Sequence, residues 1–272
     1  MPEPDRPLQR LLRRDRLLLI LCLVLLCVLA WVHLWNGAGM QEHGVTMQPG
    51  MSMPMEMAAP NAAGFLLVLA MWWVMMIAMM LPSATPAILL YERVHAHARA
   101  SDSERATART YLFAAGYLLC WLAFSLVAAL VHGWLAGSGQ ISADLLAFTN
   151  PWVSGAILLA VGLYQLSPLK TVCLAHCRSP AGFFANHWRP GQMGAILLGI
   201  RHGLFCLGCC WVLMLLLFVA GVMNLLWIVL LSLFVLAEKL IPYGPVVARV
   251  SGILLVVLGL TSLVREAAVW PF

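Results

Sequence analysis

Long apolar runs separated by short polar segments make up most of the chain. A helix needs roughly 20 mostly apolar residues to cross a membrane, and the sequence contains seven segments close to this length. They cover residues 17–35, 64–81, 111–135, 152–167, 193–220, 223–241 and 246–264. This pattern predicts an all-α fold, a polytopic transmembrane helical bundle of about seven helices.

Composition narrows the class further. Hydrophobic residues make up 62% of the chain and charged residues 10%, which is not typical of a soluble domain. The sequence has no phosphate-binding glycine-rich loop and no aspartyl-phosphate motif, so a primary pump is excluded and no nucleotide is expected. We predict a single membrane domain that is not an enzyme.

Basic residues indicate the orientation of the bundle. They gather in the N-terminal tail and in the segments after the second, fourth and sixth apolar runs, whereas 36–63 and 136–151 contain no Lys or Arg. The positive-inside rule therefore predicts a cytoplasmic N-terminus and, with seven spans, a C-terminus outside. The net charge of +5 reflects this topology and does not indicate nucleic-acid binding.

The predicted topology divides the chain into five parts. The first apolar run is long and lacks a clean cleavage site, so we interpret it as an uncleaved anchor. The parts are a basic cytoplasmic tail (1–16), a transmembrane anchor helix (17–35), a Met-rich outer loop (36–63), a metal-binding helical membrane domain (64–264) and an outer C-terminal tail (265–272).

Methionines are concentrated in the segment 71–80, which reads MWWVMMIAMM. Met71, Met75 and Met79 recur every fourth residue, so on a helix they share one face, with Met76 and Met80 beside them. Thioethers are neutral and prefer soft ions, above all Cu(I). Such a ladder fits a path for a soft metal ion, but methionine also fills irregular gaps in cores, and packing remains the alternative.

The outer loop contains a second group of methionines. Met51, Met53, Met55 and Met57 alternate among Pro, Gly and polar residues. A polar, turn-rich segment has no need of apolar side chains for packing, and exposed thioethers are liable to oxidation. We therefore predict that this loop captures Cu(I) or Ag(I).

The segment 193–220 contains a group of thiols with a histidine. His202, Cys206, Cys209 and Cys210 lie at i, i+4, i+7 and i+8, on one face of a helix. We predict that they are metal ligands at mid-membrane depth, the alternative being that buried cysteines act as small hydrophobic residues. Arg201 is costly at such a depth, and Glu238 is its expected partner in a structural ion pair.

A third group lies in the predicted inner loop after residue 167. Cys173, His176 and Cys177 face a reducing compartment in this topology, so a disulfide is not expected. Lys170 and Arg178 nearby would favour the thiolate form, which is the form that binds metal. One Cys pair with one His falls short of a closed zinc site.

The predicted sulfur donors change across the membrane, from thioethers outside, through thioethers and thiols at the centre, to thiols inside. This order suits Cu(I). The expected function is to bind Cu(I) and to move or deliver it, with the lipid bilayer and a periplasmic or cytoplasmic copper chaperone or client metalloprotein as partners. Two other functions remain open. One is a thiol-redox or cofactor-assembly protein that uses Cys206, Cys209 and Cys210, and the other is a structural subunit of a larger membrane complex.

Several motifs resemble those of a bacterial family of predicted metal-binding integral membrane proteins of unknown function. They are Trp-Trp-x-Met-Met-x-Ala-Met-Met-x-Pro-Ser (72–83), Tyr-Gln-Leu-Ser-Pro-Leu-Lys-x-x-Cys-Leu-x-x-Cys-Arg-x-Pro (164–180), Cys-Leu-Gly-Cys-Cys-Trp-x-Leu-Met (206–214), and Gly-x-Met-Asn (221–224) with Glu238-Lys239. The resemblance covers about 64–264 and implies a polytopic helical fold, metal binding and a location in the bacterial inner membrane. The outer loop and first helix lie outside the shared motifs.

Overall fold

A computed structural model describes residues 6–42, 62–98, 103–141 and 146–269. Over these ranges the chain forms ten α-helices and one 3₁₀ helix, with a single isolated bridge between Ile141 and Phe148. The all-α prediction is confirmed for this part of the chain.

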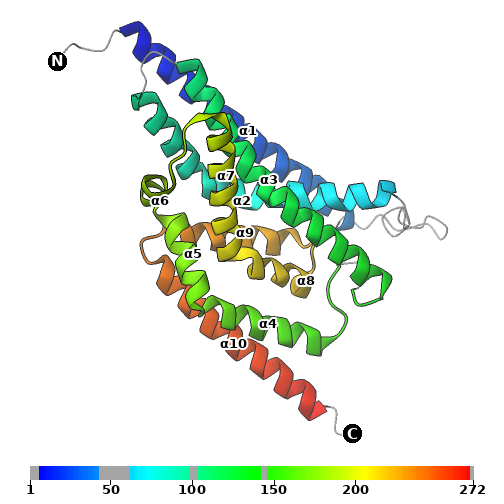
Figure 1. The fold of residues 1–272 in the computed structure, drawn as a ribbon. Helices are drawn as coiled ribbons and strands as arrows, with labels where there is room; N and C mark the ends of the chain where they lie inside the picture. Colours follow the sequence, from blue (N-terminus) through cyan, green and yellow to red (C-terminus); the bar gives the residue numbers. More distant parts are fainter. Residues whose placement is uncertain (1–5, 43–61, 99–102, 142–145, 270–272) are drawn as a thin grey trace.

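Three long helices begin the fold. They are α1 (Arg6–Glu42), α2 (Ala62–Ala98) and α3 (Ser103–Gly137), and α2 contacts both of the others. All three extend beyond the predicted segments, and α2 continues through Pro82 and Pro86. In Figure 1 they run through the upper part of the molecule, where α7 (Gly191–Cys210) packs along α3.

The middle of the chain forms a broken helix. The axes of α4 (Pro151–Gln165) and α5 (Pro168–Arg178) differ by 61°. Proline at the first position of α5 lacks the N–H that would continue α4, and Ser167 caps the new helix by accepting a hydrogen bond from the Lys170 N–H at 3.2 Å. The short α6 (Pro180–His187) then leads to α7.

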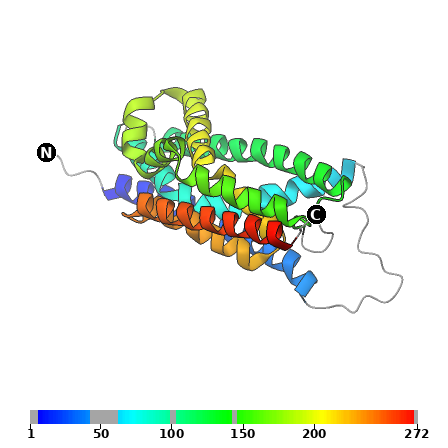
Figure 2. The ribbon, with the colours of Figure 1, turned by 90° about the horizontal axis from the view of Figure 1, so that it is seen from below.

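After α7 the chain continues through a 3₁₀ turn, η1 (Trp211–Leu215), into α8 (Leu216–Ala220). Gly221 has φ of 98°, a left-handed conformation that favours glycine, and it reverses the chain into α9 (Leu225–Leu240). The last helix, α10 (Gly244–Val269), packs along α4 at the bottom of Figure 1. The start of α1 and the end of α10 lie at opposite ends of the bundle (Figures 1 and 2).

The number of spans agrees with prediction only in part. Among the described residues, five segments are long and apolar enough to cross a membrane, and the bent pair α4 and α5 raises the number to six if it counts as one span. The sixth predicted segment, 223–241, corresponds to α9, which has 16 residues, fewer than a straight crossing normally needs.

The five candidate spans differ strongly in burial, and this locates the centre of the bundle. Within its most apolar window α2 is 61% buried, whereas the windows of α1 and α10 are 22% and 17% buried. The outer helices therefore expose apolar faces, as a membrane bundle would to lipid, and α2 lies at the core.

Candidate metal centre

A cluster of sulfur atoms lies where α7 meets α2, α5 and α9. Cys206, Cys209 and Cys210 occupy the last two turns of α7, and each is at most 2% exposed. All eight cysteines of the protein are free thiols. The three cysteines therefore lie on one buried face of α7, as predicted, and this face points into the core of the bundle.

The backbone of α7 changes at these thiols. The Cys209 and Cys210 thiols both donate to the Cys206 carbonyl oxygen, each at 3.0 Å, and the α-helix gives way to the 3₁₀ turn directly after Cys210. A 3₁₀ segment within a span often accompanies a functional position. The sulfur atoms thus gather around a break in the helix.

Residues of α2 and α3 close one side of the cluster. The Cys210 Sγ lies 3.8 Å from the Met80 Sδ, so a thiol and a thioether face each other. The Tyr117 hydroxyl lies 3.1 Å from the Cys206 Sγ and 3.2 Å from the Met80 carbonyl oxygen. Tyr117 of α3 therefore contacts both α7 and α2 at the cluster.

The predicted inner-loop group is part of the same cluster. Cys173 and Cys177 belong to helix α5, which packs on α7, and the Cys177 Sγ lies 3.9 Å from the Cys209 Sγ. The Cys173 Sγ lies so close to Gly208 that a β-carbon at position 208 would be 2.7 Å away. The two thiol groups predicted as separate sites therefore adjoin each other.

His176 has a different environment from its neighbouring cysteines. Its ring stacks on Phe205 with the centroids 4.2 Å apart, and its Nδ1 lies 2.9 Å from the Val172 carbonyl oxygen. These contacts hold the imidazole against the surface of α7. The structure gives it a packing role, and a ligand role for His176 stays a prediction.

Lys239 reaches the cluster from α9. Its Nζ donates to the Cys206 Sγ at 3.0 Å and to the Ser83 Oγ at 3.0 Å, and the side chain is 6% exposed. In the described part of the chain Lys239 has no carboxylate partner. An ammonium group beside a thiol stabilises the thiolate form, so Cys206 is the group that can balance this buried charge.

A second polar network lies next to the first and corrects the expected ion pair. Glu238 accepts hydrogen bonds from the Lys170 Nζ at 2.8 and 2.9 Å and from the Gln165 Nε2 at 2.9 Å. Lys170 also donates to the Gln165 Oε1. Arg201 does not take part, because it lies on the exposed face of α7, one residue before the buried His202.

His202 lies one helical turn before Cys206 and is 3% exposed. Its ring packs among the rings of Phe113, Tyr117 and Phe183, with centroid distances of 6.0, 5.9 and 5.2 Å. The His202 Nδ1 is buried without a hydrogen-bond partner in the described structure. Because buried polar atoms are normally paired, this nitrogen is available as a further ligand.

The methionine ladder lies in the core of the bundle. Met75 and Met79 are at most 1% exposed, and Met71 is half-buried nearer the start of α2. Met80, beside the predicted row, is the methionine whose sulfur approaches a thiol in the described structure. The outer-loop residues Met51, Met53, Met55 and Met57 lie outside the described residues.

The sulfur atoms of the centre lie close together in pairs. Within the described ranges no group of three or more His, Cys, Asp or Glu side chains is arranged to hold a metal ion. The close approaches are thiol to thiol, at Cys177 and Cys209, and thiol to thioether, at Cys210 and Met80. Sulfur donors of these two kinds select soft ions such as Cu(I).

The centre also includes residues that the sequence pattern does not predict: Lys239, Tyr117 and Ser83. The sequence does indicate that Lys239 needs a partner, because it forms with Glu238 a pair of adjacent charges in an otherwise apolar segment. Each such charge costs about 2.5–3.5 kcal/mol on insertion scales. Glu238 and Lys239 are about 100° apart around α9, so they face different partners. Tyr117 and Ser83 carry no such signal in the sequence.

The comparison with known protein families gives one result. The model of the PpoB2 family, described as copper chaperone, matches residues 69–262. This range includes Met80, Cys177, Cys206 and Lys239, and it lies within the region 64–264 that carries the motifs. No curated protein and no solved structure matches the chain.

Proposed function

This chain belongs to the PpoB2 copper chaperone family, and from this premise we propose that it is an integral membrane protein that binds Cu(I) at the sulfur cluster of α7 and delivers it to a client protein. The proposed ligands are thiolates of α7 and α5, supplemented by the thioether of Met80. The proposed location is the bacterial inner membrane.

One observation carries the proposal. Lys239 is a buried cation whose hydrogen-bond partners are the Cys206 Sγ and the Ser83 Oγ. A buried charge is costly unless it is paired, and a thiolate is the form of cysteine that binds metal. The arrangement supports a cluster adapted to hold negative sulfur away from water.

Charge balance explains why such a cation suits Cu(I). Thiols release their protons when they bind a metal, so one Cu(I) held by two thiolates leaves a complex of net charge −1. The Lys239 ammonium, 3.0 Å from Cys206, neutralises this charge inside the bundle. We infer that Lys239 stabilises the loaded centre without itself being a ligand.

The succession of sulfur atoms supports a direction for exchange within the centre. Met80 and Cys210 adjoin on the α2 side, and Cys209 and Cys177 adjoin on the α5 side. Thioethers are weaker donors than thiolates, so copper accepted near α2 would pass to the thiolates and leave through α5. Cys177 and Cys173 are half-buried, so a client thiol could approach them.

The experiment is Cu(I) loading of the purified protein under reducing conditions, followed by measurement of copper per chain. We expect about one copper per wild-type chain and loss of copper in Cys206→Ser/Cys209→Ser. Cys22→Ser is the matched control, since Cys22 is exposed on α1, and it should load like wild type. A wild-type protein that stays free of copper would overturn the proposal.

A second function is favoured by the 3.9 Å separation of the Cys177 and Cys209 sulfur atoms, which suits thiol–disulfide exchange. Exchange would require both thiols and would not require Met80. Met80→Leu distinguishes the two functions. Weakened Cu(I) binding in this variant supports copper handling, whereas unchanged Cu(I) binding together with reversible Cys177–Cys209 oxidation supports exchange.

A further inference from the structure

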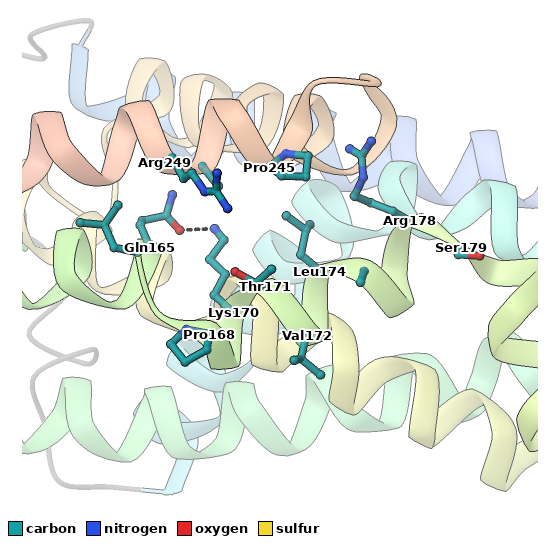
Figure 3. A pocket seen from close by; sticks show the side chains of 13 residues that line it. Gln165, Pro168, Lys170, Thr171, Val172, Leu174, Arg178, Ser179, Pro245 and Arg249 are labelled. Carbon is teal, nitrogen blue, oxygen red and sulfur yellow. Dashed lines mark hydrogen bonds between the residues drawn. The ribbon is translucent and has the colours of Figure 1, made fainter.

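A pocket of about 590 Å³ lies at the break between α4 and α5, where α10 begins. Figure 3 shows it from close by, with Lys170 and Arg249 reaching toward the same space beside Gln165. The pocket is separate from the sulfur cluster, since none of its lining residues is a cysteine or methionine. Copper binding therefore does not account for it.

The pocket carries excess positive charge. Its lining includes Lys170, Arg178 and Arg249, and in the described structure it includes no carboxylate. Lys170 is neutralised by Glu238 behind the wall. Arg178 donates to the carbonyl oxygens of α9 and the following turn, which satisfies its N–H groups but leaves its charge unbalanced.

Arg249 is the third basic residue of this pocket. It lies in the first turns of α10, its side chain is exposed, and it forms no hydrogen bond or ion pair with the described residues. A guanidinium group presents a planar fork of donors that matches phosphate oxygens. Two unbalanced guanidinium groups on one pocket indicate an anionic ligand, and a phosphate group fits best.

The rest of the lining indicates what the phosphate is attached to. Leu166, Val172 and Pro245 line the same pocket and are exposed, and Leu169 beside them is 59% exposed. An apolar wall beside a cationic one suits a molecule with a charged head and an apolar tail. A free phosphate ion would leave the apolar wall unused.

The location of the pocket in the bundle also favours a ligand with a charged head and an apolar tail. The pocket lies at the end of the bundle where the basic residues predict the cytoplasmic face, and basic pockets between spans on that side bind anionic headgroups. We propose that this pocket binds the phosphate headgroup of an anionic phospholipid, with Arg249 as its principal contact and the acyl chains along α5. This lipid would stabilise the bend between α4 and α5. Cys177 belongs to α5.

Native mass spectrometry of the protein in neutral detergent tests the proposal, with phosphatidylglycerol or phosphatidylcholine added in equal amounts. We expect wild type to retain phosphatidylglycerol in preference. In Arg249→Gln the affinity for phosphatidylglycerol should fall about fivefold, as expected for one basic residue near a lipid surface, and Arg249→Lys should restore most of it. Arg265→Gln is the matched control, at the far end of the same helix, and should bind like wild type.

Three results would overturn the proposal. They are equal retention of the two lipids, equal losses in Arg249→Gln and Arg265→Gln, and displacement of the lipid by inorganic phosphate at equal concentration, which would indicate a site for free phosphate. Copper content measured on the same samples separates this proposal from the proposed function. Arg249→Gln should load Cu(I) like wild type, because Arg249 does not line the sulfur cluster.

Discussion

At the level of single residues, the electrostatics of the bundle depend on two adjacent side chains of α9. Glu238 pairs with Lys170 on one side, and Lys239 contacts Cys206 on the other. One cation is therefore paired with a carboxylate, and the next contacts a cysteine sulfur. The metal centre and the neighbouring ion pair share a short stretch of helix, yet separate substitutions can test them.

The first prediction concerns Lys239. Lys239→Met removes the ammonium that we propose balances a copper–thiolate complex, so Cu(I) affinity should fall about tenfold to a hundredfold, the value of a hydrogen bond to a charged group. Competition with a chromogenic Cu(I) chelator measures this. Lys239→Arg keeps the charge and should recover part of the affinity, whereas wild-type affinity in Lys239→Met would exclude the role proposed for this residue.

The second prediction concerns the ion pair. Lys170→Met leaves the Glu238 carboxylate buried without its cation, and removing one partner of a buried pair costs about 3–5 kcal/mol. Lys170→Met/Glu238→Met removes both charges and should regain most of this stability. Unfolding in mixed detergent micelles measures the free energies.

Arg201→Gln is the control for the ion pair, since Arg201 is exposed, and surface substitutions usually change stability by about 0.5 kcal/mol or less. A loss in Arg201→Gln as large as in Lys170→Met would instead support an Arg201–Glu238 pair.

At the level of elements, the close approach of α3 and α7 positions the thiols. Gly199 and Gly203 lie four residues apart on α7, and a β-carbon at position 199 would overlap the Phe113 carbonyl oxygen of α3. Small residues at this spacing let helices approach closely in membranes. The contact brings Tyr117 to within 3.1 Å of the Cys206 Sγ.

The third prediction tests this contact. In Gly199→Ala the added methyl group forces α3 and α7 apart, which should cost about 1–3 kcal/mol of unfolding free energy and weaken Cu(I) binding. Gly133→Ala is the matched control, because a β-carbon there meets nothing within 4 Å. Equal stability of the two variants would show that the approach of these helices does not matter.

The elements also show what the sequence could and could not predict. Helical periodicity placed Cys206, Cys209 and Cys210 on one face, and the structure has them there. The approach of Cys177 to Cys209 depends on the bend after Gln165, and periodicity carries no information on how a broken helix folds back. The contact of Lys239 with Cys206 joins two helices at residues 33 positions apart, so the sequence pattern likewise does not predict it.

At the level of the whole molecule, the topology remains a prediction with structural support. The start of α1 and the end of α10 lie at opposite ends of the bundle (Figures 1 and 2), as an odd number of crossings requires.

The fourth prediction concerns a reporter protein that is active outside the cell membrane and inactive in the cytoplasm. When it is fused to the C-terminus, we expect it to be active. The reverse result would mean that α9, or the pair α4 and α5, does not cross.

The family match places the chain in a copper chaperone family, and the structure has a buried sulfur cluster within the matched region. X-ray absorption at the copper edge of the Cu(I)-loaded protein connects the two most directly. We predict a coordination shell of two or three sulfur atoms that is lost in Cys206→Ser and kept in Cys22→Ser. A shell of nitrogen or oxygen, or a sulfur shell unchanged by Cys206→Ser, would contradict it.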